Sequence, residues 1–148
     1  MFDQIPEEIQ DCIFYKFLYS NFLRDFKWFF ECEKKFTKIK YNFYTWDDQV
    51  YRDFMIQVLI KLEPRREEKE SVIFYELDDF SEILFFMKGY VDIGFELNRK
   101  RFFVLRKGAG VILADHGCTF GHTSNFIYKT HTVCEGFSIR KLDWQCII

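Results

Sequence analysis

The hydrophobic pattern changes near residue 70, from a repeat of about four residues to a repeat of two. Before that point, Ile9, Ile13 and Phe17 recur at four-residue spacing, the spacing of one face of an α-helix. After a break at Ser20–Asn21, a second apolar stripe follows, formed by Leu23, Phe26 and Phe30. These stripes predict that the chain begins with helices.

A further helix is predicted between Asp48 and Pro64. Asp47 or Asp48 provides a side chain that caps a helix N-terminus, and the residue before Pro64 avoids the helical region. The predicted inner face of this helix consists of Tyr51, Phe54, Val58 and Leu62. Residues 34–44 lack a helical pattern and are predicted to connect the helices.

Residues 82–96 hold two apolar runs on either side of Lys88–Gly89. In the second run, apolar residues take alternate places, at Val91, Ile93, Phe95 and Leu97. A period of two is typical of a strand with one face on a core. Because glycine supplies the backbone freedom of a tight turn, the two runs are predicted to form a β-hairpin.

Most of the remaining chain is predicted to form short strands separated by turns. Strands are predicted at 72–75, 102–105, 126–129 and 132–139, with turns at 78–79, 98–101 and 107–110 and a helix beginning at residue 140. The mixed-charge residues 63–69 are interpreted as a solvated turn. Helices followed by many short antiparallel strands define an α+β fold.

Length and composition narrow the function classes. The chain has 148 residues, which favours one domain or one domain with an appended helical segment. The net charge is −2, and acidic and basic residues are interspersed, so the sequence gives no sign of a basic surface for binding nucleic acid. The chain has no apolar run of membrane-spanning length and no secretory signal, so a cytoplasmic location is expected. Five scattered cysteines are interpreted as reduced, buried thiols.

Four segments in order resemble the cyclic-nucleotide-binding domain of ion channels and its helical C-linker. They are IPEEIQDCIFYKFLYSNFLRDFKWFF (5–30), VIFYELDDFSEILFFMKGYVDIGFE (72–96), RKGAGVILAD (106–115) and THTVCEGFSIRKLDW (130–144). The resemblance implies an antiparallel jelly-roll β-barrel preceded by helices. It divides the chain into a C-linker-like segment, 1–45, and a β-roll with its leading helix, 46–148. The family's final lid helix is not represented before Ile148.

The resemblance also implies where a cyclic nucleotide would bind. Gly110 lies in the turn that leads into the phosphate-binding cassette, and Leu113, Ala114 and Asp115 fall at the family's Phe-Gly-Glu positions. A slip of one residue would instead place Leu113 and Ala114 at the glycine and the glutamate. Ser124 takes the place of the arginine that pairs with the cyclic phosphate.

This cassette departs from the family in its charge. Asp115 can accept a hydrogen bond from a ribose hydroxyl, whereas Ser124 can donate only one neutral bond. Charged hydrogen bonds contribute about 1.5–3 kcal/mol and neutral ones about 0.5–1.5 kcal/mol. Lys129, the nearest basic residue, is expected on the opposite face from Ser124. Affinity for cAMP or cGMP is therefore expected to be weak or lost.

The resulting functional hypothesis is a non-enzymatic regulatory and assembly module of a potassium channel subunit. Its expected partners are the channel's transmembrane region and neighbouring subunits, in a homo- or hetero-tetramer at the inner face of a membrane. The first alternative is a functional cAMP or cGMP sensor, stand-alone or of the kinase-regulatory type. The second is a structural interaction domain without ligand or channel.

Three further groups of residues give weaker indications of a function. Asp115, His116, Cys118 and His122 are metal-ligand types, but zinc sites usually combine two close pairs and no second pair is visible. Ser124, with His122 and Asp115, lacks the nucleophile elbow of a hydrolase. Lysines alternate with aromatic residues over 34–46, which allows contact with an anionic membrane surface; packing under the β-roll is the preferred interpretation.

Overall fold

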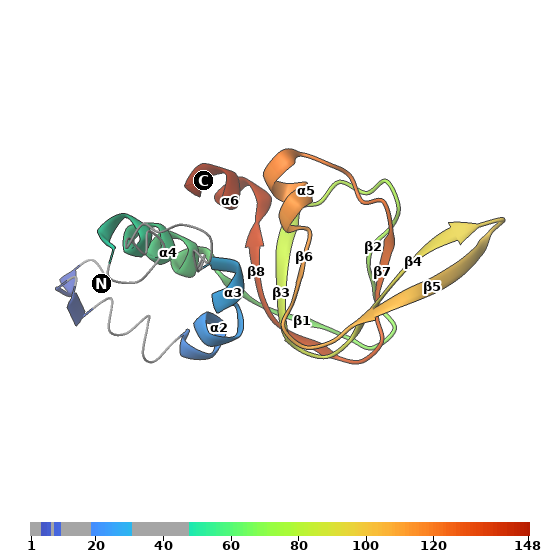
Figure 1. Cartoon of the computed structure of the whole chain (residues 1–148), viewed down its shortest axis with the longest axis horizontal. Helices are drawn as coiled ribbons and strands as arrows, with labels where there is room; N and C mark the ends of the chain where they lie inside the picture. Colours follow the sequence, from blue (N-terminus) through green and yellow to red (C-terminus); the bar gives the residue numbers. More distant parts are fainter. Residues whose placement is uncertain (1–3, 7, 10–18, 31–47) are drawn as a thin grey trace, which may run out of the picture. The chain divides into compact units, whose positions relative to one another are not determined.

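The computed structural model describes residues 4–6, 8, 9, 19–30 and 48–148 (Figure 1). The chain forms two compact units, Met1–Ile60 and Lys61–Ile148, and each is described on its own. The domain boundary predicted at 45/46 lies outside the described residues. So do Ile13, Phe17, the predicted connection 34–44, and residues 34–46, for which packing under the β-roll is preferred over membrane contact.

In the first unit, two short helices carry an aromatic stripe. Helix α2 spans Ser20–Asp25 and helix α3 spans Lys27–Phe30. The buried side chains are Phe22, Phe26 and Phe30, and the ring centroids of Phe22 and Phe26 are 5.1 Å apart. Two members of the predicted stripe are confirmed. Leu23 is only half-buried, because Phe22 continues the four-residue spacing toward the N-terminus.

Helix α4, Gln49–Lys61, begins and ends near the predicted signals. The Asp48 carboxylate accepts a hydrogen bond from the Tyr51 N–H (2.9 Å), so Asp48 is the capping residue. The helix ends before Pro64, as predicted. Its buried residues are Tyr51, Met55, Val58 and Leu59. Phe54 is half-buried, because the inner face is turned toward Met55 and Leu59, on the other flank of the line through Tyr51 and Val58. Leu62, also predicted on this face, is buried just beyond the helix end.

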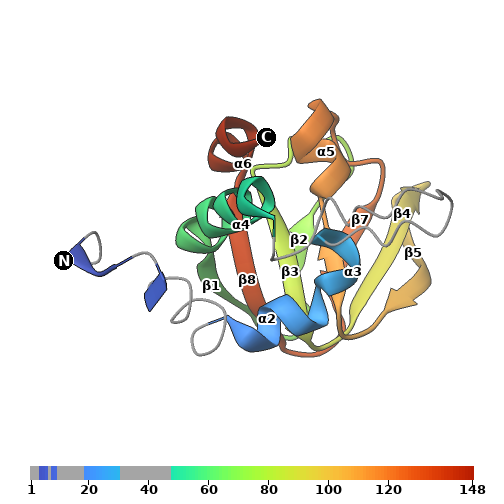
Figure 2. The ribbon, with the colours of Figure 1, turned by 60° about the vertical axis from the view of Figure 1, so that its left-hand side comes forward.

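The second unit consists of two four-stranded antiparallel sheets with two helices. The first sheet has the order β1-β8-β3-β6 and the second the order β2-β7-β4-β5. Figures 1 and 2 show the sheets as opposite walls, with α5 at one end of the strands. Within Lys61–Ile148 the sheets are separate, so the antiparallel strands are confirmed and closure into one continuous barrel is not. The elements are β1 Glu63–Glu67, β2 Val72–Phe74, β3 Glu82–Lys88, β4 Val91–Leu97, β5 Lys100–Lys107, β6 Val111–Leu113, α5 Asp115–Phe120, β7 Ile127–Thr130, β8 Cys134–Arg140 and α6 Lys141–Ile147.

The hairpin predicted across Lys88–Gly89 is wrong. Strand β3 pairs with β6 and β8, whereas β4 pairs with β5 and β7, so the two runs lie in different sheets. Ile83, Leu84, Phe85 and Phe86 are all fully buried, which fits a strand with both faces covered. Lys88–Val91 is therefore a corner at which the chain changes sheets. A local turn signal does not distinguish a corner from a hairpin.

Four such corners meet at one end of the strands, which we call the crossing end. They are the connections β1–β2 (68–71), β3–β4 (89–90), β5–β6 (108–110) and β7–β8 (131–133). Hydrogen bonds join neighbouring corners. The Tyr90 N–H donates to the Thr132 hydroxyl (2.9 Å), and the Tyr90 carbonyl accepts from the His131 N–H (2.8 Å). The opposite end, which we call the cassette end, holds the connections β2–β3 (75–81) and β6–β7 (114–126).

The hairpin in this unit is β4–β5, which Figure 1 shows as a long projecting ribbon. Its tip is the two-residue turn Asn98–Arg99, and both residues have positive φ (51° and 64°). Such a turn matches the twist of the flanking strands. The predicted tip 98–101 and strand 102–105 are therefore confirmed in place, but the strand starts earlier, at Lys100, and ends at Lys107.

Strand β1 corrects the interpretation of residues 63–69 as a solvated turn. Glu63–Glu67 pairs with β8 at the edge of the first sheet. Charged residues and a proline are typical of edge strands, where they discourage pairing with another chain. Here Arg65 pairs with Glu82 (3.0 Å) and Arg66 with Glu135 (2.9 Å), so the charges that suggested a turn are matched across strands.

The remaining predicted strands at 72–75, 126–129 and 132–139 are confirmed as β2, β7 and β8, and the predicted C-terminal helix is α6. The chain is thus a mixed α and antiparallel-β structure, as predicted. Among the described residues, none of the helices has the length and apolar character that a membrane span requires.

Gly89 and Gly110 both lie at the crossing end, and substituting each by alanine tests how closely the chain crosses there. Both have positive φ (99° and 79°), but only at Gly89 would a Cβ lie 2.4 Å from the Val133 carbonyl oxygen; at Gly110 it would meet nothing within 4 Å. We expect Gly110→Ala to lower the free energy of unfolding by about 1–2 kcal/mol, the cost of a left-handed residue. Gly89→Ala should cost about 1–3 kcal/mol more, because the backbone must also move. Urea unfolding measures both; equal losses would contradict a close crossing.

Candidate ligand pocket at the cassette end

The cassette end contains a pocket with a volume of about 420 Å³. Its walls come from two regions that are far apart in sequence: the β2–β3 connection, and the stretch from Ala114 through α5 to Tyr128 in β7. The lining residues are Phe80, Ala114, Asp115, His116, Gly117, His122, Thr123, Asn125, Phe126 and Tyr128. This volume lies within the range of about 300–1,000 Å³ that is usual for small-molecule sites.

The pocket has an aromatic wall that depends on Gly117. A Cβ at Gly117 would lie 2.0 Å from the Phe80 ring, so the ring packs directly against the α5 backbone. Phe80 also packs edge-on against Phe74, at a centroid distance of 4.9 Å, and Phe74 in turn against Tyr128, at 6.1 Å. Phe80 and Phe74 are buried and Tyr128 is half-buried. The aromatic wall is therefore held in place by packing behind it.

Helix α5 is fixed by α6. The Trp144 indole N–H donates to the Thr119 hydroxyl (2.9 Å), and the Gln145 side-chain amide donates to the Cys118 carbonyl (2.9 Å). Ala114, with φ of 68°, turns the chain from β6 into the helix, and Gly121 ends it with an N–H bond to the Gly117 carbonyl (2.8 Å). From the sequence, residues 115–120 are interpreted as part of a polar loop, and no helix is predicted there.

The structure brings two of the predicted binding residues, Ala114 and Asp115, into this pocket. Leu113 is buried in β6, opposite Leu84. Gly110 lies at the crossing end, where its N–H donates to the Phe86 carbonyl (2.9 Å). Of these predicted residues, only Ala114 and Asp115 are thus placed to touch a ligand in the pocket.

Ser124 has a different position from the one that a phosphate contact requires. It is fully buried, and its hydroxyl donates to the Phe126 carbonyl (2.6 Å). Its backbone is bound to the β2–β3 connection through Asp78 (2.9 Å) and Leu77 (2.7 Å). Ser124 therefore holds together the two connections that form the pocket, and it is not among the pocket's lining residues.

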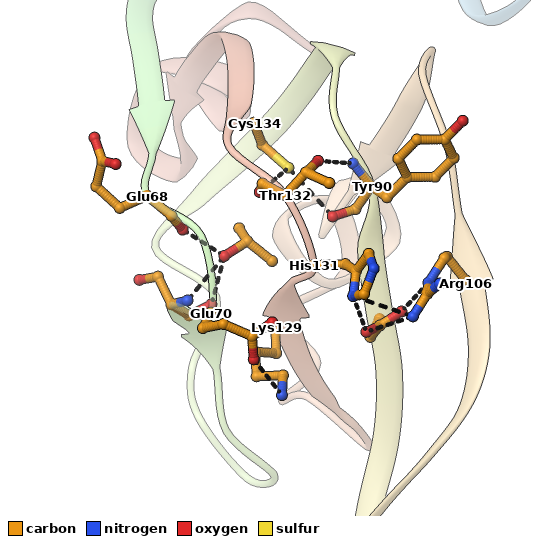
Figure 3. Close-up of polar contacts among 11 residues, drawn as sticks. Glu68, Glu70, Tyr90, Arg106, Lys129, His131, Thr132 and Cys134 are labelled. Carbon is orange, nitrogen blue, oxygen red and sulfur yellow. Dashed lines mark hydrogen bonds and ion pairs between the residues drawn. The ribbon is translucent and has the colours of Figure 1, made fainter.

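Lys129 lies away from the pocket, on the other face of β7 from Tyr128. Its ammonium pairs with the Glu70 carboxylate (2.9 Å), as Figure 3 shows. The ammonium also lies 4.5 Å from the centre of the Phe103 ring. The hydrogen bond from Lys129 lowers the pKa of Glu70. Both observations place this lysine in a surface ion pair near the crossing end.

Figure 3 shows the hydrogen-bond network near the crossing end, to which Lys129 belongs. The buried Thr130 hydroxyl donates to the Glu68 carbonyl (2.5 Å) and accepts from the Ser71 N–H (2.8 Å), which fixes the β1–β2 corner. The network also contains the buried carboxylate of Asp92, which accepts from Arg106 Nε (2.6 Å) and lies 3.3 Å from His131 Nδ1. The groups satisfy one another, which is typical of a structural network.

The metal and hydrolase alternatives gain no geometric support. Among the described residues, no group of three or more His, Cys, Asp or Glu side chains is placed to hold a metal ion. His116 and His122 stack on each other with ring centroids 5.2 Å apart. Burial raises the pKa of the Cys118 thiol to about 11, so this thiol is protonated at neutral pH. The Ser124 hydroxyl is bound to a carbonyl oxygen.

Several pocket residues were missed in the sequence: Phe80, Gly117, Thr123, Asn125, Phe126 and Tyr128. Phe126 and Tyr128 are two residues apart at the start of the predicted strand 126–129, so their common face was available as a signal. Phe80 gave no such signal in the sequence, because only the fold brings the β2–β3 connection against α5.

Comparison with solved structures supports the fold. No protein family matches the sequence, and no curated protein matches it. The regulatory domain of Toxoplasma gondii PKA, solved with cAMP, is similar with a TM-score of 0.60 and 12% identity, over 68% of this chain and 38% of that one. The regulator CLP of Xanthomonas campestris, described as responsive to c-di-GMP, has a TM-score of 0.54 and 20% identity, over 65% and 47%.

A third similar structure is the regulatory subunit of a cAMP-independent protein kinase A from Trypanosoma cruzi, bound to guanosine. Its TM-score is 0.57 and its identity 10%, over 64% of this chain and 34% of that one. The chain thus spans less than half the length of each of these three proteins. At these identities the likeness shows the fold alone: about two thirds of the chain shares the fold of these three regulatory proteins.

The Asp92–Arg106 contact predicts a pH dependence of stability. The hydrogen bond from Arg106 lowers the pKa of Asp92, against the opposing effect of burial. A depressed carboxyl pKa adds stability above the unfolded value, about 3.9, and this stability is lost as the pH falls through the lower folded value. Arg106→Gln should therefore destabilise the protein most at neutral pH, and the difference from wild type should shrink as the pH falls below about 4.

Urea unfolding at several pH values from 7 to 3 measures this difference. Arg101→Gln is the matched control, because Arg101 lies on the same strand and pairs with the exposed Glu96 at 3.6 Å. Its effect should be small at every pH, since exposed pairs contribute little. A constant difference between Arg106→Gln and wild type over the whole range would contradict the assigned role of Asp92.

Proposed function

We propose that the chain is a non-catalytic regulatory domain with a cyclic-nucleotide-binding fold, in which affinity for cyclic nucleotides is weak or lost. The observation that carries this proposal is the charge of the pocket. None of its described lining residues is lysine or arginine, and Asp115 brings a carboxylate into it. A cyclic phosphate transferred from water into such a site would lose hydration without gaining the guanidinium or ammonium partner that normally compensates for it.

The positions of Ser124 and Lys129 add support. Ser124, where the family resemblance puts the phosphate-binding arginine, is buried and committed to the Phe126 carbonyl. Lys129 is committed to Glu70 on the other face of β7. Neither residue can reach a ligand in the pocket without breaking a bond that it already makes, so neither replaces the missing charge.

The second candidate function is a cyclic-nucleotide sensor. The observation that favours it is the pocket itself, which lies in the β6–β7 connection and includes Asp115, a possible acceptor for a ribose hydroxyl. The Toxoplasma structure contains cAMP. Against it, the Trypanosoma regulatory subunit belongs to a kinase described as cAMP-independent, so the fold by itself does not imply a cAMP sensor.

For the host protein we propose a potassium channel subunit, with the domain on the cytoplasmic side and the helical unit in contact with neighbouring subunits. The support is the sequence resemblance of the ordered segments to channel domains. The aromatic stripe of α2 and α3 adds to it, because Trp28 is exposed beside the buried Phe30 and offers apolar surface to a partner.

The missing positive charge predicts that a cation added at the pocket restores binding. Asn125 is exposed and lines the pocket, so Asn125→Arg can be accommodated there. We expect wild type to bind cAMP and cGMP with Kd values no tighter than about 1 mM. Asn125→Arg should improve affinity about tenfold or more, since a charged hydrogen bond contributes about 1.5–3 kcal/mol.

Asn125→Met is the control, because it has a long side chain without the charge. Isothermal titration calorimetry with both nucleotides measures all three proteins. Micromolar binding by wild type would overturn the proposed function in favour of the sensor. Equal affinities of the Arg and Met variants would show that charge is not the missing element.

A channel host predicts assembly and a membrane-spanning neighbour. The full-length transcript should encode transmembrane segments in the same polypeptide, and the purified chain should form oligomers at high concentration through its first unit. Light scattering of the chain and of a Trp28→Ser variant measures the second point. A monomer at all concentrations, together with a transcript that lacks such segments, would refute the channel host and leave an adaptor.

A further inference from the structure

We propose that the cassette-end pocket binds an uncharged aromatic ligand that carries hydroxyl groups, of the nucleoside class and without a phosphate. This inference rests on the proposed function. It assigns a ligand to a pocket in which no arginine or lysine is present to pair with a phosphate. The pocket retains two features that such a ligand needs: an aromatic wall, and polar side chains other than lysine and arginine around one carboxylate.

The aromatic wall is preformed. Phe80 is held between the backbone of Gly117 and the Phe74 ring, and Tyr128 contacts Phe74 from the other side. Phe126 lies at the mouth of the pocket and remains 45% exposed. A heterocyclic base can stack on such side chains whatever its identity, because every base has a π-face. Little conformational entropy is lost where the rings are already ordered by packing.

The polar groups suit a sugar better than a phosphate. The Asp115 carboxylate is acceptor-only and can accept from two vicinal hydroxyls. Thr123 and Asn125 offer a hydroxyl and an amide at the same pocket. Burial raises the pKa of Tyr128, so its phenol remains protonated and able to donate. Each of these contacts is available to a neutral ligand, whereas a phosphate would add a second negative charge beside Asp115.

The pocket is also supported on both sides. Helix α5, which contributes Asp115, is bound by Trp144 and Gln145 of α6. The segment that contributes Thr123, Asn125 and Phe126 is bound through Ser124 to the β2–β3 connection. The walls are thus fixed before a ligand arrives, which favours specific binding of a small rigid molecule.

Calorimetry and NMR titration with adenosine, guanosine, cAMP and cGMP test the proposal. We expect a nucleoside to bind more tightly than the matching cyclic nucleotide. Phe126→Ala should weaken nucleoside binding about 5- to 150-fold, the effect of losing one stacking contact. Asp115→Asn should weaken it about tenfold or more, because a charged acceptor is replaced by a neutral one.

Phe102→Ala is the matched control, because Phe102 is 44% exposed on β5 and is not a lining residue of the pocket. It should leave the affinity unchanged, and urea unfolding should confirm that the three variants are folded. If no nucleoside binds, this inference is overturned while the proposed function stands. If cyclic nucleotides bind more tightly than nucleosides but only at millimolar Kd, this inference is likewise overturned and the proposed function stands; if they bind at micromolar Kd, the proposed function itself fails. If Phe126→Ala and Phe102→Ala act alike, the ligand site is not this pocket.

Discussion

The close crossing of the chain between two sheets is the constraint on which the rest of the second unit depends. Four connections pass from sheet to sheet at one end, and Gly89 lies so near the Val133 carbonyl that no side chain fits between them. Hydrogen bonds from Tyr90, Thr130 and Thr132 satisfy the polar groups of these corners. Because backbone groups buried without partners are costly, these bonds allow the sheets to approach each other here. The longer connections then lie at the opposite end, where they leave room for a pocket.

The charge of the pocket depends on where the basic side chains of the second unit form their ion pairs. Lys129 and Arg106 are paired with Glu70 and Asp92 on the second sheet, near the crossing end. The cassette end keeps a carboxylate at Asp115 and an aromatic wall. The walls of the pocket are held by packing among protein side chains, so under the proposed function the fold keeps its shape without a cyclic nucleotide. This separation of stability from binding lets the same architecture serve as a receptor or as a scaffold.

The two helices of the second unit connect the pocket to the C-terminal residues. Helix α6 comes directly after β8, and its Trp144 and Gln145 bind α5. A displacement of α5 would therefore be transmitted to α6 by two hydrogen bonds and by packing around the buried Trp144. This coupling is physical and local. The two hydrogen bonds tie the position of α6 to that of α5, which forms part of the pocket wall.

The sequence alone determined the elements whose signals are local. The alternation over Val91–Leu97 marks β4, and the Asp48 cap and Pro64 bracket α4, because each depends on neighbours along the chain. Only the tertiary structure decided that the Lys88–Gly89 turn joins different sheets, that Glu63–Glu67 is an edge strand, and that Phe80 and Asp115 line one pocket. Those facts depend on contacts between residues about 35 to 75 positions apart, from Phe80 with Asp115 to Glu63 with Ser138. A turn signal specifies backbone geometry but not the partner strand, whereas partner choice depends on burial and hydrogen bonding across the whole unit.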